Sequence, residues 1–238
     1  MFKMKKILAN IRGVLFYLSI VMGLVAVVPP WLFYCALFKK QHKFMLVGKP
    51  FFAVIFFLFG IKVKIEGVLP EQGKACFMLC NHQSFIDVPA ILYRTFPCAF
   101  LAKKSLFNIP YFGLLLTYAG CIPVERGNPQ ANADLPRKIK LRLSRNFPVA
   151  AFPEGTRSAN SELLPFKNGI FRIIKDAKVP VFPVTLIDTY KILPKSGIAL
   201  YPGEIKVVPH KIISAEEIAG ISYEELKELV RAEIGAYP

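Results

Sequence analysis

The first 64 residues contain ten lysines and arginines but no acidic residue. Within this stretch the 26 residues from Gly13 to Phe38 carry no charge, and a second apolar run covers residues 51–61. A helix rises about 1.5 Å per residue, so the first run is long enough to cross a bilayer, whereas the second is too short. This combination of apolar length and purely basic flanks predicts a membrane-binding segment.

Pro29 and Pro30 lie inside the charge-free run, where two prolines are expected to break or sharply kink a helix. Basic clusters flank the run on both sides. A single span would put one cluster on the non-cytoplasmic face, against the positive-inside tendency, whereas a broken hairpin in one leaflet keeps both clusters at the same anionic surface. We therefore favour the hairpin over the span. A cleaved signal peptide fits the basic start, but no small-x-small cleavage site follows.

The distribution of charge separates this segment from the rest of the chain. The net charge is +15, of which residues 1–64 carry +10, residues 65–211 carry +9 and residues 212–238 carry −4. A hydrophobic content of 54% rules out disordered basic tails as the source. Nucleic-acid binding is disfavoured, because much of the charge flanks apolar runs and no RNA-binding signature is present. We expect a membrane-anchoring helical segment at 1–64 and a folded domain at 65–238.

The folded domain alternates short apolar runs with helical stretches, which predicts an α/β sheet. Strands are expected at residues 75–80, 99–102, 119–124, 149–152, 179–186 and 204–208. Helices are expected at about 88–96, 111–119, 132–146, 167–177 and 215–234. The run 179–186 contains two prolines, which favours an edge or irregular strand.

Polar residues follow the apolar runs at four places, each where a strand is expected to end. They are Asn81-His82, Lys103, Arg126 and the stretch from Glu154 to Arg157. In open α/β sheets, ligands bind beyond the carboxyl ends of the strands. We therefore expect one edge of the sheet to bring these scattered groups together.

His82 and Asp87 are the strongest catalytic candidates. A neutral imidazole can take a proton from a hydroxyl if a carboxylate orients it and stabilises its charge. Residues five apart do not share a helix face, but Pro89 suits the first turn of a helix that starts near Asp87, which leaves His82 in the preceding loop. The structural alternative is that Asp87 only caps the helix and His82 is a loop histidine. Ser84 lacks a nucleophile-elbow motif, so a base acting on a substrate hydroxyl is favoured.

Residues 152–158 read Phe-Pro-Glu-Gly-Thr-Arg-Ser and form a second candidate site. Gly155 lets the backbone approach a ligand closely, and the Arg157 guanidinium suits bidentate binding of phosphate. A turn with a surface arginine is the alternative. Convergence of Arg157 with Lys103 and Arg126 near the His–Asp pair would form a pocket for a phosphate monoester. No nucleotide-binding glycine loop is present.

The five cysteines are an odd number without a CxxC pair. No cluster of cysteine and histidine completes a zinc site around them. We expect buried, reduced thiols.

Together these motifs resemble those of the bacterial 1-acylglycerol-3-phosphate O-acyltransferases (lysophosphatidic acid acyltransferases) of the glycerolipid acyltransferase superfamily. Residues 81–87, Asn-His-Gln-Ser-Phe-Ile-Asp, match the family motif N-H-x-x-x-x-D, and residues 152–158 match F-P-E-G-T-R-S. Residues 120–126 and 179–184 resemble the second and fourth family blocks, so all four occur in order. Pro123 and Glu125 depart from the usual neighbours in the second block, which barely affects Arg126.

The resemblance implies a glycerol-3-phosphate acyltransferase-like fold, a mixed sheet flanked by helices, preceded by the N-terminal helical membrane hairpin. It implies transfer of an acyl group from acyl-ACP or acyl-CoA to the sn-2 hydroxyl of lysophosphatidic acid, giving phosphatidic acid, with no metal or tightly bound cofactor. The site would lie at the cytoplasmic face of the inner membrane. His82 would act as general base with Asp87 as its partner. The substrate-binding residues would be Asn81, Lys103, Arg126, Glu154, Gly155, Thr156 and Arg157.

Two alternatives to this function are open at the level of sequence. An acyltransferase of the same superfamily could use another lyso-lipid acceptor, such as a lyso-ornithine lipid or another lysophospholipid, although the cations favour a phosphate. A non-catalytic protein that binds anionic membranes is the second alternative. The intact His82 and Asp87 argue against it.

Overall fold

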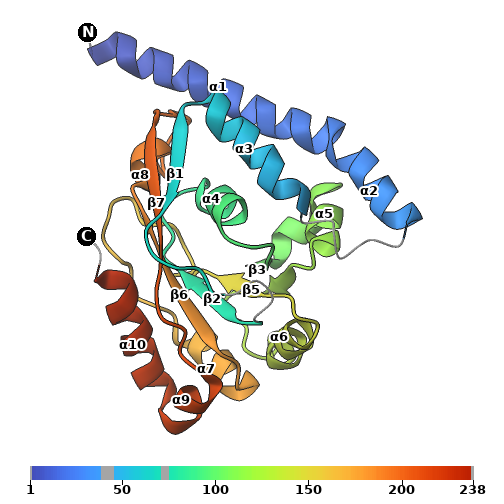
Figure 1. Cartoon of the computed structure of the whole chain (residues 1–238), viewed down its shortest axis with the longest axis vertical. Coiled ribbons are helices and arrows are strands. Elements are labelled where there is room, and N and C mark those ends of the chain that lie inside the picture. The colour runs from blue at the N-terminus through green and yellow to red at the C-terminus, as the bar shows by residue number, and fades with distance from the viewer. Residues whose placement is uncertain (1, 39–45, 71–74, 237–238) are drawn as a thin grey trace.

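The computed structural model describes residues 2–38, 46–70 and 75–236. At its centre stands a seven-stranded sheet with helices on both faces (Figure 1). A long rod made of α1 (Phe2–Ala26) and α2 (Val28–Leu37) lies along one side of this body. The predicted α/β architecture is confirmed.

The strands follow the spatial order β1-β7-β6-β2-β5-β3-β4. Neighbouring strands are parallel except β6 and β7, which are antiparallel. The sheet is therefore mixed, as the resemblance implied. The bounds are β1 Ile61–Ile65, β2 Phe77–Cys80, β3 Ala99–Lys103, β4 Ile122–Val124, β5 Val149–Ala151, β6 Val181–Ile187 and β7 Gly203–Pro209.

Helices cover both faces of the sheet. Their bounds are α3 Gly48–Leu58, α4 Asp87–Arg94, η2 Lys104–Asn108, α5 Phe112–Tyr118, α6 Leu135–Ser144, α7 Asn168–Ala177, α8 Thr189–Ile192, α9 Ala215–Gly220 and α10 Tyr223–Gly235. Met78 and Phe182 belong to a core with α3 and α4, whereas their neighbours Phe77 and Val181 belong to a core with α6, α7 and α10. This alternation follows the two-residue period of a strand, and coverage of both faces makes the central strands continuously apolar.

Strand β6 lies inside the sheet, between β2 and β7, so the expectation of an edge strand is wrong. The reason is the direction of the Pro183 backbone. The Pro183 carbonyl accepts the His210 N–H at 3.1 Å, just beyond the end of β7. The N and C=O of one strand residue point toward the same neighbouring strand. The nitrogen of Pro183, which has no hydrogen to donate, therefore points toward His210 and not toward β2. The ladder between β6 and β2 is therefore intact.

Strand β1 is an element that the sequence reasoning missed. Its residues alternate between the buried Ile61 and Val63 and the exposed Lys62 and Lys64, and it pairs in parallel with β7. Such alternation is the ordinary signal of a half-covered strand, but its lysines also continue the acid-free stretch. The strand runs across the boundary expected between residues 64 and 65.

Pro29 and Pro30 do not break the N-terminal helix, which corrects the expected kink. They occupy the first turn of α2, where a missing N–H costs least. The Val27 N–H bonds to the Gly23 carbonyl and the Trp31 N–H to the Val27 carbonyl, so helical hydrogen bonding crosses the junction. Figure 1 shows α2 continuing α1 and α3 running back beneath α1. The break expected within residues 13–38 is therefore absent, and α3 runs back along the helix that α1 and α2 form. These two arms, α1–α2 and α3, are the N-terminal hairpin of this structure.

The first arm is apolar, exposed and attached to the domain. By length and composition the helix Lys3–Leu37 could cross a membrane, since it is long, apolar and mostly exposed. Its exposed apolar side chains include Met4, Leu8, Leu15 and Phe33. The Leu200 N–H donates to the Ala9 carbonyl at 2.9 Å, which ties α1 to the loop before β7. These features indicate membrane association.

The segment expected as one helix at 215–234 forms two helices, α9 and α10. Each begins with a capping box, Ser214 with Glu217 and Ser222 with Glu225. The second Ser-x-x-Glu motif marks a new helix start, because it satisfies the free N–H groups of the first turn of α10.

The five cysteines are buried and form no disulfide, as expected. Burial raises the pKa of the Cys76 thiol to about 12, and it raises the pKa values of Cys80 and Cys98 well above their ordinary value. Thiols that stay protonated at neutral pH pack as small apolar side chains.

Candidate active site

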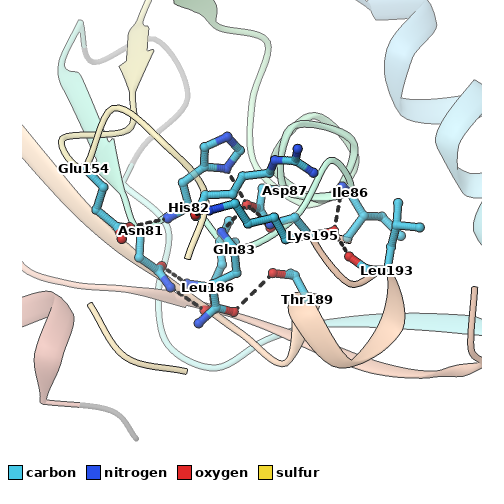
Figure 2. A network of polar contacts seen from close by, with 12 residues as sticks. Asn81, His82, Gln83, Ile86, Asp87, Glu154, Leu186, Thr189, Leu193 and Lys195 are labelled. Carbon is cyan, nitrogen blue, oxygen red and sulfur yellow. Dashed lines mark hydrogen bonds and ion pairs between the residues drawn. The ribbon is translucent and has the colours of Figure 1, made fainter. Parts of the chain in front are cut away.

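Residues 81–87 form the turn between β2 and α4, since β2 ends at Cys80 and α4 begins at Asp87. Asn81 anchors the start of the turn. Its buried side-chain amide donates to the Leu186 carbonyl at 2.8 Å and accepts the Leu186 N–H at 2.7 Å (Figure 2). Asn81 therefore joins the turn to β6, and the direction in which the chain leaves the sheet is fixed.

His82 and Asp87 are in direct contact. His82 Nδ1 lies 2.6 Å from Asp87 Oδ2, which also accepts the N–H groups of Gln83 and Ser84 at 2.8 Å each. Asp87 is fully buried. An ionised carboxylate only accepts hydrogen bonds, so Nδ1 carries the proton in this contact. The Nε2 atom of His82 is then the basic nitrogen.

Packing fixes the His82 ring as well. The ring stacks on Phe152 with 4.0 Å between the ring centroids and 14° between the planes. The His82 carbonyl accepts the Ser158 N–H at 2.7 Å, and the His82 side chain keeps 18% of its surface exposed. Since Phe152 covers one face and Asp87 binds Nδ1, Nε2 is the ring nitrogen left to meet a ligand.

Glu154 joins two loops behind His82. Its buried carboxylate accepts the His82 N–H at 2.6 Å and the Leu164 N–H at 2.9 Å. Burial raises the pKa of Glu154 to about 7, although both N–H bonds favour the charged form. Because these contacts are to the main chain, Glu154 shapes the site by holding the loops together.

Gly155 closes a turn that includes Glu154, because its N–H donates to the Phe152 carbonyl at 3.1 Å, and Thr156 and Arg157 follow this turn. Gly155 has a φ of +68°, a conformation that favours glycine, and Thr156 is exposed. Arg157 folds over Phe85, with its Cζ atom 3.8 Å from the ring centroid. Arg157 therefore lies against the same turn that carries His82.

Lys103 and Arg126 lie farther along the same edge of the sheet. Strands β2, β5, β3 and β4 are parallel, so their carboxyl ends share one edge, as predicted. Lys103 ends β3, two strands from β2, and Arg126 follows β4, three strands away. At about 4.8 Å per strand these offsets are roughly 10 and 14 Å. Arg157 thus contacts the turn that carries His82, whereas Lys103 and Arg126 are exposed side chains that begin two and three strands away on the same edge.

Glu125, which departs from the family pattern, has a local explanation. Its carboxylate pairs with Lys104 at 2.7 Å, and this contact holds the pKa of Glu125 below its ordinary value. The Asn132 side chain bonds to the Glu125 N–H and carbonyl at 3.1 and 2.6 Å. These contacts hold the segment that precedes Arg126.

The segment around α8 holds the turn that carries His82 in place through two side-chain hydrogen bonds. The fully buried Ser84 hydroxyl donates to the Leu193 carbonyl at 2.6 Å, and the Thr189 hydroxyl donates to Gln83 Oε1 at 3.2 Å. Burial of Ser84 fits the expectation that it is not a nucleophile. These contacts were not expected, since α8 is far from the motif in sequence.

Lys195 is a further residue of this region that the sequence reasoning missed. Its Nζ atom donates to the Arg157 carbonyl at 2.6 Å, and the same peptide group donates the Ser158 N–H to His82. Figure 2 shows the Lys195 side chain beside the His82 turn. Because 38 residues separate Lys195 from Arg157, no local pattern could indicate this contact.

The fold and the site define an α/β protein that carries an H-x-x-x-x-D pair at the carboxyl edge of a mixed sheet. Residues 60–187 match the family model described as Acyltransferase. The chain therefore belongs to the acyltransferase family.

Named relatives align with this chain over different shares of their own length. The chain is 35% identical over 179 residues to the chloroplastic 1-acyl-sn-glycerol-3-phosphate acyltransferase BAT2 of Brassica napus, covering 74% of this chain but only 51% of that protein. It is 30% identical over 173 residues to the 1-acyl-sn-glycerol-3-phosphate acyltransferase of Helicobacter pylori, covering 72% of this chain and 73% of that protein. This chain thus spans about half the length of the plant relative.

A solved structure matches nearly the whole chain. The crystal structure of the 1-acyl-sn-glycerophosphate acyltransferase PlsC from Thermotoga maritima is 26% identical, with a TM-score of 0.83. The match covers 99% of this chain and 95% of that one, so the likeness includes the N-terminal helices as well as the sheet.

Proposed function

We propose that this protein is a 1-acyl-sn-glycerol-3-phosphate acyltransferase, which moves an acyl group from a thioester to the sn-2 hydroxyl of lysophosphatidic acid. The contact of His82 with Asp87 beside Arg157 carries the proposal. It combines a base for a hydroxyl with a cation for a phosphate. The names of the relatives, which specify the same acceptor, support it.

His82 acts as the general base in the proposed mechanism. Its Nε2 takes the proton of the acceptor hydroxyl, while Nδ1–H donates to Asp87 across 2.6 Å. As the imidazolium forms, the buried carboxylate stabilises its charge. A positioned base of this kind contributes roughly 100- to 10,000-fold to the rate.

The acyl group passes directly from donor to acceptor. The hydroxyl oxygen attacks the thioester carbonyl carbon and forms the new C–O bond. The tetrahedral intermediate then expels the thiol as its C–S bond breaks, and His82 Nε2 returns the proton to the sulfur. The products are phosphatidic acid and the free thiol of ACP or CoA, and the imidazole is neutral again.

Cations along the carboxyl edge bind the acceptor phosphate in this proposal. Arg157 contacts the turn that carries His82, and Lys103 and Arg126 add positive charge along the same edge. Arginine forms two parallel hydrogen bonds to phosphate, which fixes orientation as well as charge. Asn81, Glu154, Gly155 and Thr156 shape the binding loops around them.

The N-terminal hairpin holds the domain at the cytoplasmic face of the inner membrane. Lys3, Lys5 and Lys6 lie in the first two turns of α1 beside its exposed apolar side chains, a combination that favours an anionic lipid surface. The acceptor and the product both carry acyl chains in the bilayer, so an anchored domain meets them there.

A panel of acceptors tests the proposed function. Purified full-length protein is incubated with lysophosphatidic acid, lysophosphatidylethanolamine or a lyso-ornithine lipid, with acyl-ACP or acyl-CoA, and products are identified by mass spectrometry. We expect phosphatidic acid as the main product. Preferred acylation of another lyso-lipid would reassign the acceptor, and no acylation with any donor would favour a non-catalytic lipid-binding protein.

A further inference from the structure

Phe85 is the exposed residue of an otherwise buried motif. Its surface is 59% exposed, whereas Gln83, Ser84, Ile86 and Asp87 are each at most 4% exposed. Single exposed apolar residues are common on proteins, so exposure alone carries no functional meaning. What distinguishes Phe85 is the charged group that lies on its ring.

The Arg157 guanidinium rests on the Phe85 ring, 3.8 Å from the centroid, well within the range of a cation–π contact. The Arg157 main chain is fixed separately. Its carbonyl accepts a bond from Lys195, and the next N–H binds the His82 carbonyl. Phe85 therefore positions the guanidinium group of Arg157, and the loop contacts position its main chain.

An aromatic ring holds a guanidinium without neutralising it. A carboxylate partner would cancel the charge and occupy the N–H donors, whereas a π face leaves the charge uncompensated and the donors without a partner. Within residues 2–38, 46–70 and 75–236, no ion pair involves Arg157, and its buried Nη1 has no hydrogen-bond partner. The arginine is thus held in place with its charge uncompensated.

We propose that Phe85 is a positioning residue, whose ring holds the Arg157 guanidinium in the orientation that binds the phosphate of the acceptor. This inference rests on the proposed function and adds a specificity role to a position that the motif leaves variable. Phe85 acts through Arg157 and takes no part in proton transfer.

Substitutions at Phe85 can distinguish the effect of its aromatic ring face from that of its apolar bulk, and they test this role. Phe85→Leu keeps an apolar side chain without a π face, and Phe85→Trp keeps a stronger one. We expect Phe85→Leu and Phe85→Ala to raise the KM for lysophosphatidic acid roughly three- to thirtyfold, with kcat and the KM for the acyl donor nearly unchanged. Phe85→Trp is expected to stay near wild type. Because the side chain is exposed, the thermal unfolding midpoint of Phe85→Leu should not move.

A second background distinguishes positioning of Arg157 from any other effect of Phe85. In Arg157→Ala protein, Phe85→Leu should cause no further rise in KM, since the group that Phe85 holds is gone. Calorimetric binding of glycerol 3-phosphate to the same variants should give the same ranking without turnover. If wild-type protein binds glycerol 3-phosphate but does not acylate lysophosphatidic acid, the proposed function fails and this ranking still tests Phe85. Wild-type affinity in Phe85→Leu, or an undiminished effect in Arg157→Ala, would overturn the inference.

Discussion

Asp87 is the residue on which the candidate site depends most. One of its oxygens accepts the His82 ring N–H and two backbone N–H groups, so a single buried carboxylate orders both the base and its turn. Asparagine keeps the shape and one acceptor but cannot stabilise an imidazolium. We expect Asp87→Asn to lower kcat roughly 100- to 10,000-fold in steady-state assays, with little change in the KM for the acceptor. Retention of most of kcat would show that His82 does not need this partner.

Glu154 predicts a pH dependence of stability. Its pKa in the folded chain is about 7, above the ordinary value of about 4.3 in an unfolded chain. Between these values the folded state binds more protons, so its stabilising effect is complete below about pH 4.3 and is lost as the pH rises through 7. The contribution to the free energy of unfolding should fall by at most about 1.4 kcal/mol per pH unit.

Urea unfolding at pH 5, 6, 7 and 8 checks the Glu154 prediction against a matched variant. Glu154→Gln cannot titrate, so its unfolding free energy should lose this component of the pH slope, even though its baseline stability is lower. The lower baseline arises because a glutamine oxygen can serve only one of the two N–H groups. Identical slopes for both proteins would assign the pH dependence to other groups.

Individual site residues differ in how far sequence could reveal them. The pairing of His82 with Asp87 was predictable, because a five-residue spacing ending at a helix start lets the loop fold back. Lys195 was not, since its contact with Arg157 depends on the packing of α8 against the turn. The stacking of Arg157 on Phe85 also depends on two loops that meet only in the folded chain.

Among the elements, α1 is held to the domain at a point with no room for a side chain. A Cβ atom on Gly13 would lie 1.5 Å from the Ile198 carbonyl oxygen, so the helix or the 198–200 loop would have to move. We expect Gly13→Ala to lower the free energy of unfolding by about 1–3 kcal/mol, a typical cost of overpacking. Trypsin cleavage within α1, followed by mass spectrometry, should also become faster.

Gly220 provides the control for Gly13. It also lies in a helix, at the end of α9, and a Cβ atom there would meet nothing within 4 Å. Gly220→Ala should leave both stability and cleavage of α1 nearly unchanged. If Gly13→Ala behaved in the same way, the contact between α1 and the loop would not contribute to the fold.

At the scale of elements, the apolar runs predicted most of the strands of the sheet. The predictions that rested on prolines, an edge strand at 179–186 and a kink at Pro29-Pro30, were wrong. The strands at 75–80, 99–102 and 149–152 were predictable as apolar runs with clear ends. From the sequence, Pro183 was expected to disturb the sheet and Pro29-Pro30 to break the helix. In the structure the nitrogen of Pro183 points toward His210, beyond the end of β7, and the two prolines lie in the first turn of α2. Only the tertiary arrangement determines which backbone groups need a partner.

At the scale of the whole molecule, the hairpin is part of the domain core and also its apolar surface. Phe16, Ile55, Phe56 and Phe59 are buried in the same core as Met78. Removing residues 1–60 would therefore expose that core, and loss of membrane binding after such a deletion could not be separated from unfolding. Surface substitutions are the sharper experiment.

A stripe of exposed apolar side chains on α1 should control membrane binding. Its members Leu8, Ile11, Leu15 and Leu18 are three or four residues apart and all more than half exposed. We expect Leu8→Glu with Leu15→Glu to lower binding to vesicles rich in anionic lipid at least tenfold in flotation assays. Leu229→Glu on α10, which adds one negative charge on a helix distant from α1, should have little effect (Figure 1). Full binding by the double variant would place the membrane contact elsewhere.

The most direct test of the proposed chemistry is the rate of phosphatidic acid formation by wild-type and His82→Ala protein, with lysophosphatidic acid and an acyl thioester, at matched vesicle binding. If His82 is the base that activates the acceptor hydroxyl, wild-type protein makes phosphatidic acid and His82→Ala is slower by roughly 100- to 10,000-fold, while both bind vesicles equally. Near-normal turnover by His82→Ala would contradict the mechanism at its centre.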